Sequence, residues 1–393
     1  MNYTEDQYFA VSTLEKWYNK AKHQVIEVSG VEGTGTYETI KMFIDKIGFD
    51  PREIMYLSFD QKQVIEMASH RYHCYYIYSI IYKYIRIVDF NTIPILNPSS
   101  TEIKDQWVKK VRKHIDPRYR IIVVFDAVLM NRELLQDLMT FDLPIILLTD
   151  PMAIPAPDSY TFSHESNIVL RQLNPDLARN PITYFANKAL RGGKLEPGNY
   201  DTVSIVPKKN MNLYNLKSAD MIITMSQDVA DNINNVYRHR IKRFKGNING
   251  PGERVIVMNN MYNHKLVNKD EKRIKVSLSK GTVCYISKCN RHSPSTRYVP
   301  IELKTEFYYE PFQDLIMDRN YLNGVDTPSR QLIPDEVVLL KYAYALPVDL
   351  TRCDHWDKVT LIIDNNDQLD PSIQYRFIYN AMIRAHQSMT VIV

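Results

Sequence analysis

A glycine-rich loop between an apolar strand and an amphipathic helix constrains the fold of this chain more than any other feature. The stretch VIEVSGVEGTGTYETIKMFID covers residues 25–45 and places Gly30, Gly33 and Gly35 between the two elements. Glycine is the default residue where a backbone takes positive φ or must be approached closely. The spacing therefore predicts a tight turn from strand to helix, a geometry that presents backbone N–H groups to phosphate.

The residues after this loop depart from the signature of a phosphate-binding loop. That signature has a lysine and then Ser or Thr directly after the last glycine, whereas this chain has Thr36 and Tyr37. The lysine neutralises the β- and γ-phosphates, and the hydroxyl holds Mg²⁺. A positive charge lost ~4 Å from a phosphate costs roughly 4 kcal/mol at an effective dielectric constant of about 20. That loss corresponds to about a thousandfold in affinity.

Short apolar runs alternate with helical patterns through the first 150 residues. Residues 120–128 and 144–150 are almost entirely apolar, which is typical of central strands of a parallel sheet. Further strands are expected at 24–30 and 53–59, with helices at 38–47, 61–70 and 131–140. This order predicts a doubly wound α/β domain.

The alternation restarts after Gly192 and Gly193 and is then interrupted by a β-rich segment. Strand 220–226 and helix 227–244 precede several short strands that have no helices between them. From about residue 335 the α/β style returns and ends in strand 389–393. We expect two α/β domains, 1–190 and 191–393. A small insertion near 75–118 belongs to the first, and a small antiparallel β-barrel at about 250–335 to the second.

Composition excludes several classes of protein. The 393 residues are 45% hydrophobic and 24% charged with a formal net charge of +4, which is ordinary for a globular chain and permits a polyanionic partner. The four cysteines, Cys74, Cys284, Cys289 and Cys353, form no CxxC pair, so no metal site is expected, and reduced thiols fit a cytoplasmic protein. The N-terminus is acidic and polar, unlike a signal peptide. No apolar run reaches the ~18 residues of a membrane span.

The order of motifs along the whole chain resembles that of superfamily 1B DNA helicases of the RecD and Dda type. The resemblance implies two RecA-like domains, each with a parallel sheet, and an SH3-like β-barrel inserted in the second. The matching stretches are YTEDQYFAV, GVEGTGTYE, LSFDQ, VVFDAVLM, LLTDPMAIPAP, LRQ followed by PITYFANKALRGGK, and IYNAMIRAHQSMTVIV.

The resemblance also assigns roles to residues of a nucleotide site. It implies that Gln7 reads adenine, that Asp126 holds Mg²⁺, and that Asp150 belongs to a motif that senses the γ-phosphate. It implies that Arg171 and Arg384 stabilise charge in phosphoryl transfer, although both are also read as residues that hold a cleft together. The retained members are Gln7, Gly30, Gly33, Gly35, Asp126, Asp150, Arg171 and Arg384.

Two further departures remove parts of the hydrolytic machinery. Ala127 stands where the family has the glutamate that orients the attacking water, and Ala153 where it has a glutamine. A positioned proton acceptor is worth ~10²–10⁴ in rate. We therefore expect an inactive, vestigial site without a cofactor, and ATP and Mg²⁺ only if activity is retained.

Candidate contacts with single-stranded DNA are aromatic and basic. Phe59 lies at a DNA-contacting motif of the family, and Tyr75, Tyr76 and Tyr78 follow in RYHCYYIYSIIYKY. The strongest basic cluster, YRHRIKRFK, contributes Arg238, Arg240 and Lys242, which also fit a solvated helix face. Basic grooves with stacking aromatics are the general means of binding single strands.

Three functional hypotheses follow. The first is a catalytically inactive helicase-like scaffold that binds DNA or protein in replication, recombination or packaging of a phage or mobile element, in the host cytoplasm. The second is a divergent ATP-dependent 5′-to-3′ DNA helicase. The third is a pure interaction protein, such as a host-takeover or virion factor, with a filled nucleotide pocket. None of them involves a membrane.

Overall fold

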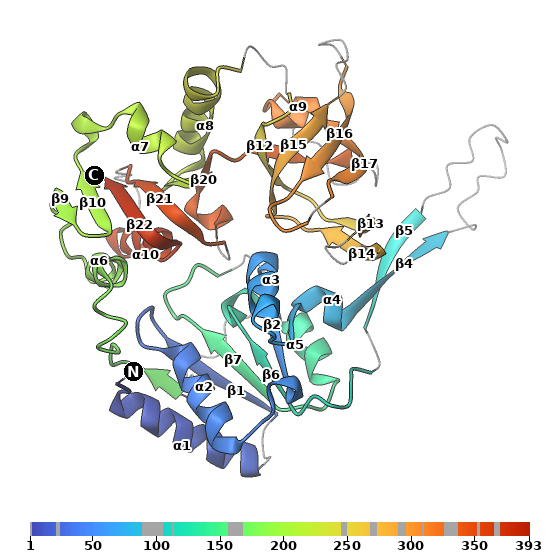
Figure 1. The fold of residues 1–393 in the computed structure, drawn as a ribbon, viewed down its shortest axis with the longest axis vertical. Coiled ribbons are helices and arrows are strands. Elements are labelled where there is room, and N and C mark those ends of the chain that lie inside the picture. The colour runs from blue at the N-terminus through green and yellow to red at the C-terminus, as the bar shows by residue number, and fades with distance from the viewer. Residues whose placement is uncertain are drawn as a thin grey trace. The chain divides into compact units, whose positions relative to one another are not determined.

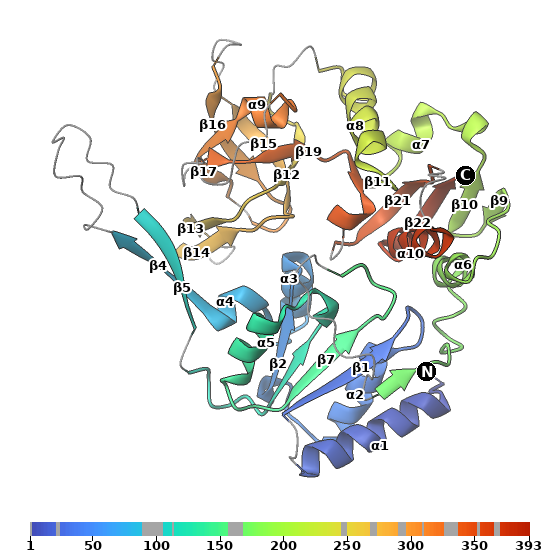
Figure 2. The ribbon, with the colours of Figure 1, turned by 180° about the vertical axis from the view of Figure 1, so that it is seen from behind.

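The chain divides into two compact units, Met1–Leu177 and Ala178–Val393, seen from opposite sides in Figures 1 and 2. The boundary falls before helix α6 (Pro181–Leu190) and not after it as expected, because α6 packs against a helix of the second unit. None of the helices in the described residues is long and apolar enough to cross a bilayer. The computed structural model describes residues 2–20, 24–88, 105–111, 114–155, 168–244, 250–267, 273–289, 296–308, 310–325, 337–351, 354–364 and 370–393.

The first unit is built on a parallel sheet of six strands in the order β3-β2-β6-β7-β1-β8. The strands are β1 (Val25–Gly30), β2 (Ile54–Ser58), β3 (Cys74–Tyr76), β6 (Ile121–Val124), β7 (Ile145–Thr149) and β8 (Ile168–Leu170). The helices are α1 (Glu5–Lys20), α2 (Thr36–Ile47), α3 (Gln61–Ser69), α4 (Ile77–Ile81) and α5 (Arg132–Met139). Where a small insertion was expected, β4 (Tyr82–Val88) and β5 (Asp105–Val111) form an antiparallel ribbon.

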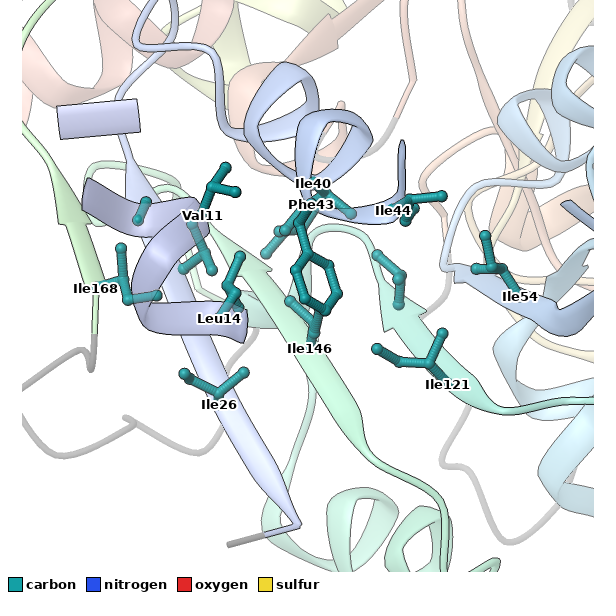
Figure 3. Packing of buried hydrophobic residues seen from close by; sticks show 14 of the residues in the cluster. Val11, Leu14, Ile26, Ile40, Phe43, Ile44, Ile54, Ile121, Ile146 and Ile168 are labelled. Atoms are coloured by element: carbon teal, nitrogen blue, oxygen red, sulfur yellow. The ribbon is translucent and has the colours of Figure 1, made fainter. Parts of the chain in front are cut away.

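Apolar clusters cover both faces of this sheet. On one face, α1 and α2 contribute Val11, Leu14, Ile40 and Phe43, which pack over strand residues such as Ile146 (Figure 3). The other face packs against α4 and α5. Every residue of the central strands β2, β6 and β7 is buried. The continuous apolar runs of the sequence are therefore explained by burial on both sides.

The second unit has its own sheet, ordered β20-β11-β21-β22-β10-β9, in which only β9 is antiparallel to its neighbour. Crossovers that run in opposite directions along the sheet put α7 and α8 on one face and α10 with α6 on the other. The elements are β9 (Gly198–Tyr200), β10 (Val203–Val206), α7 (Leu213–Lys217), β11 (Met221–Thr224), α8 (Gln227–Val236), β20 (Ala345–Pro347), β21 (Trp356–Ile362), α10 (Pro371–Met382) and β22 (Ala385–Ile392). The expected α/β class with two mainly parallel sheets is confirmed.

A third six-stranded sheet interrupts the second unit in the order β18-β17-β16-β15-β12-β19. Its two outer strands are separated by one residue of chain, so the sheet curls until its ends meet. The sheet extends to Tyr342, past the expected end at about residue 335, because β18 and β19 pair with it. Its elements are β12 (Arg254–Val257), β15 (Val283–Cys289), β16 (Tyr298–Lys304), β17 (Phe312–Asp318), α9 (Arg319–Leu322), β18 (Val337–Val338) and β19 (Leu340–Tyr342), beside the hairpin β13 (Met261–Val267) and β14 (Arg273–Leu278).

Candidate functional site

The glycine loop after β1 turns the chain directly from the strand into helix α2. Gly35 is the N-cap of α2 with φ 77° and ψ 47°, and Gly33 has φ 89°. Both lie in the left-handed region that side chains disfavour. Gly30 has ordinary φ, but a Cβ there would lie 2.3 Å from Thr34 Oγ1. The turn therefore favours glycine at all three positions.

Gln7 closes this loop from the side of α1. Its side chain is fully buried, and its Nε2 donates to the Gly35 carbonyl at 3.1 Å. Its Oε1 accepts from the Thr4 N–H at 2.9 Å and from Asn174 Nδ2 at 3.1 Å. The Asn174 N–H in turn donates to the Gly33 carbonyl at 2.8 Å. The amide that the resemblance assigns to adenine is therefore bonded within the protein at both ends.

The contact between Gln7 and Gly35 gives a first prediction. A Cβ on Gly35 would lie 2.4 Å from Gln7 Nε2, whereas Gly48 at the other end of α2 has the same φ range and nothing within 4 Å. Gly48→Ala is expected to cost about 1–2 kcal/mol of backbone strain. Gly35→Ala is expected to cost about 1–3 kcal/mol more. Chemical denaturation followed by circular dichroism compares the two variants, and equal losses would show that the contact is unimportant.

The electrostatics of the loop oppose a bound triphosphate. Residues 30–38 contain Glu32 and Glu38 and neither Lys nor Arg. Glu38 lies in the first turn of α2, and its Oε2 would be 3.3 Å from a Cβ on Gly35. A carboxylate beside a helix N-terminus is stabilised by the helix dipole and takes the position that an anionic ligand would use. Sequence analysis missed Glu38, although an acidic residue three places after a helix N-cap is the signal for it.

The Tyr37 hydroxyl is poorly suited to hold a metal ion. Burial, together with the charge and hydrogen bond of Tyr72, raises its pKa to about 12. Its ring lies 6.0 Å from that of Phe125, which stacks at 5.8 Å on Tyr56. The Tyr37 side chain therefore packs against the apolar core on the face of the sheet that α1 and α2 cover.

The end of β6 has no room for a carboxylate at position 127. Asp126 is half-buried and has φ 48° and ψ 40°, an uncommon conformation for a residue with a side chain. Ala127 has no exposed surface and packs in an apolar cluster with Met130 and Leu134. A glutamate at position 127 would therefore point into the core.

The remaining implied site residues have structural contacts inside their own units. Asp150 Oδ1 accepts from the Met152 N–H at 2.8 Å and so shapes the turn that contains the buried Ala153. The Arg171 side chain is exposed, while its N–H donates to Asp6 Oδ2 at 2.8 Å. Arg384 is 4% exposed, and its Nε donates to the Asn380 carbonyl at 3.2 Å.

Three of the expected aromatic contacts, Phe59, Tyr76 and Tyr78, are brought together at the carboxyl ends of β2 and β3. The Phe59 and Tyr78 rings are 6.0 Å apart, and Tyr78 lies 5.6 Å from Tyr76 and 6.3 Å from Tyr82. Tyr82 is buried and donates to Asp137 Oδ2 at 2.6 Å, which anchors the group. We call Phe59, Tyr76, Tyr78 and Tyr82 the aromatic cluster.

Tyr75 does not join this cluster. Its hydroxyl bonds that of Tyr119 at 2.7 Å. The Tyr119 hydroxyl also lies 3.1 Å from His73 Nδ1. Tyr75 is therefore held by a separate polar contact.

Arg238 is not available as a phosphate contact, and its assignment to DNA is wrong. The guanidinium is 3% exposed and bonds both oxygens of the buried Glu253, with Nη2 at 2.6 Å from Oε1. Its Cζ lies 4.0 Å from the centre of the Tyr342 ring. The Tyr344 hydroxyl donates to Glu253 at 3.1 Å. Arg240 and Lys242 are exposed. The helix expected over 227–244 is observed as α8 followed by a π-helix, Tyr237–Ile241, whose turns are wider.

Within the described residues no group of three or more His, Cys, Asp or Glu side chains is placed to hold a metal ion. The thiols of Cys74 and Cys284 are buried and that of Cys289 is half-buried, and none of these three described cysteines forms a disulfide. Cys353 lies outside the described residues.

The architecture defines an α/β protein with two parallel sheets, the first of which carries a glycine loop that opens a helix. No family model and no curated protein matches the chain. Solved structures that are similar to it include Pif1 helicases. One of these structures is described as the structural basis for DNA unwinding at forked double-stranded DNA by two coordinating Pif1 helicases. It is 10% identical to this chain, with TM-score 0.45 over 100% of this chain and 92% of that one.

Two further similar structures come from other sources. Pif1 of Candida albicans is 9% identical, with TM-score 0.42 over 100% of this chain and 94% of that one. The helicase nonstructural protein 10 of an arterivirus is 10% identical, with TM-score 0.35 over 97% of this chain and 62% of that one. These values describe a distant likeness, and the fold given above follows from the chain's own strand order.

Proposed function

We propose that this protein is a helicase-like scaffold that does not hydrolyse ATP and that binds single-stranded DNA. The observation that carries the first part is the phosphate loop, which keeps its turn but has Gln7 and Asn174 bonded to it from inside. Thr36 replaces the cation and Glu38 adds a carboxylate beside the helix N-terminus. A loop of this composition repels the anion that it would have to bind.

The hydrolytic step lacks a proton acceptor as well. Ala127 is enclosed by apolar side chains, so no carboxylate at that position reaches a bound nucleotide without moving the core. The scaffold is proposed to act within a replication, recombination or packaging complex of a phage or mobile element, in the host cytoplasm. Protein partners within it are part of the same proposal.

Calorimetry with a non-hydrolysable ATP analogue and Mg²⁺ tests the loss of the nucleotide site. The wild-type chain is expected to give no binding heat. The double variant Thr36→Lys with Tyr37→Thr restores the two signature residues but leaves Glu38 and the Gln7 bonds in place. It is also expected to stay silent, and restored binding would instead show an intact pocket that has only lost two side chains.

Single-stranded DNA is proposed as the ligand because of the aromatic cluster. In open α/β sheets, ligands bind outside the carboxyl ends of the strands. Phe59 directly follows β2, and Tyr76 is the last residue of β3. Both rings and that of Tyr78 are half-buried, so each keeps surface on which a base can stack. Stacking on aromatic side chains is tolerant of base sequence.

Replacing Tyr78 with leucine is expected to weaken binding of a labelled oligonucleotide by about 1–3 kcal/mol, the worth of one stacked base. Leucine keeps the apolar contacts that the Tyr78 ring makes with its neighbours but has no aromatic face on which a base can stack. Tyr75→Leu makes the same change outside the cluster and is expected to have little effect. Fluorescence anisotropy at low ionic strength measures both, and binding that does not weaken with salt, or no binding at all, would refute the proposal.

One observation favours the pure interaction protein as a second candidate. A large aromatic side chain, Tyr37, stands where the resemblance places the hydroxyl that holds Mg²⁺, and it packs with Phe125; this hypothesis predicts a large side chain at that position. The same anisotropy experiment distinguishes the two, because an interaction protein has no salt-sensitive affinity for oligonucleotides.

A further inference from the structure

We infer that one outer surface of the second unit docks an acidic protein segment that carries apolar side chains. This surface comprises residues 208–217 and 239–243, and we call it the basic surface. The inference does not depend on the proposed function, because the phosphate loop and the aromatic cluster both belong to the first unit.

The two segments of the basic surface are neighbours in space. Helix α7 packs against the π-helix that follows α8. Met211 and Ile241 pack from the two segments onto one apolar cluster, which includes Leu216 and Ile222. The inner sides of both segments are thus fixed on the sheet, and their outer sides face solvent on the α7–α8 layer (Figure 1).

The charge of this surface has one sign. Its exposed cations are Lys208, Lys209, Lys217, Arg240, Lys242 and Arg243. Neither 207–218 nor 237–244 contains Asp or Glu. None of these six side chains takes part in an ion pair within the part of the chain that the structure describes. A partner with carboxylates would be attracted to this surface and oriented by it.

Two exposed apolar side chains lie between Lys209 and Lys217 in the sequence. Tyr214 is 75% exposed and Leu213 is 46% exposed. Both stand in the first turn of α7, which a reciprocal cap holds in place. Asn212 Oδ1 accepts from the Tyr214 N–H at 2.9 Å, and Asn215 Oδ1 accepts from the Asn212 N–H at 3.0 Å. The two side chains are therefore displayed on fixed backbone, which reduces the entropy lost when they bind.

This combination fits a protein better than a nucleic acid. An apolar centre with a polar rim is the usual anatomy of protein interfaces, and tyrosine is enriched among the residues that contribute most to them. A sugar–phosphate backbone would use the cations but would gain nothing from Leu213. Leu213, Tyr214 and residues 239–243 belong to the helical layer, whereas Lys208 and Lys209 come just after the carboxyl end of β10. We therefore assign the basic surface to an acidic segment with aliphatic or aromatic residues.

The test uses a fluorescein-labelled peptide in which glutamate alternates with leucine and phenylalanine, and a second peptide with serine at every apolar position. The first is expected to bind the full chain at least about tenfold more tightly than the second. Leu213→Ser with Tyr214→Ser is expected to remove that difference. Lys208→Glu with Lys209→Glu is expected to weaken binding of both peptides.

Matched controls lie on the opposite helical layer. Tyr184→Ser removes a tyrosine of similar exposure, 56%, from α6, and Arg191→Glu with Lys194→Glu reverses two exposed cations after the same helix. Neither control is expected to change the affinity. The inference is overturned if the peptides bind equally, if neither binds, if the Leu213 and Tyr214 changes have no effect, or if duplex DNA competes more strongly than the apolar acidic peptide.

Discussion

Replacing Glu253 with glutamine is expected to destabilise the junction between the second unit's parallel sheet and its curled sheet by about 3–5 kcal/mol. Glu253 is fully buried and its carboxylate is the charged partner of Arg238, which is itself 3% exposed. Glutamine leaves the guanidinium buried without a counter-charge. It also weakens the bond from the Tyr344 hydroxyl, because a neutral amide is a poorer acceptor than a carboxylate.

Hydrogen exchange measured by mass spectrometry gives the local readout. Amides of 237–241 and 254–257 are expected to lose about two to three powers of ten in protection, since each factor of ten corresponds to about 1.4 kcal/mol. Glu302→Gln removes the exposed pair with Lys288 and is expected to cost about 0–1 kcal/mol. Unchanged protection in Glu253→Gln would mean that the buried pair does not hold the two sheets together.

Replacing Ala127 with glutamate is the second change with a large expected effect. It restores the residue that the helicase resemblance requires, yet the side chain would enter an apolar cluster where Ala127 has no exposed surface. Burying a carboxylate without a partner costs several kcal/mol, and overpacking adds about 1–3 kcal/mol. A large fall in melting temperature is therefore expected, without any gain of hydrolysis.

Val128→Glu is the matched control, because this neighbouring residue is only half-buried and the new carboxylate can reach water. Its melting temperature is expected to stay close to that of the wild type. If Ala127→Glu were as stable as Val128→Glu and began to hydrolyse ATP, the nucleotide site would lack only its catalytic side chain, and its pocket would still be open to ATP.

The sheets were predictable because their strands carry the signal within themselves. β6 and β7 are buried on both faces, so each reads as an unbroken apolar run. The glycines of the loop follow equally from local backbone geometry. The end of the β insertion was not predictable, because β18 and β19 are recognised only by their pairing with β17 and β12, which lie far away in the sequence.

Side-chain roles were harder to predict than elements. The sequence presents Arg238 as one of a run of cations, and nothing local distinguishes it from the exposed Arg240. Its partner Glu253 lies 15 residues further along the chain, beyond the end of the helical pattern. Gln7 was expected at the loop, but Asn174, which completes its bonds, comes from the far end of the unit.

Phosphate release from labelled ATP by the purified chain, with Mg²⁺ and single-stranded DNA, tests the central claim most directly. We expect no release above that of a preparation of the Asp126→Ala variant, because the loop lacks its cation and position 127 its carboxylate. Release that rises when DNA is added, and that Asp126→Ala abolishes, would contradict the account.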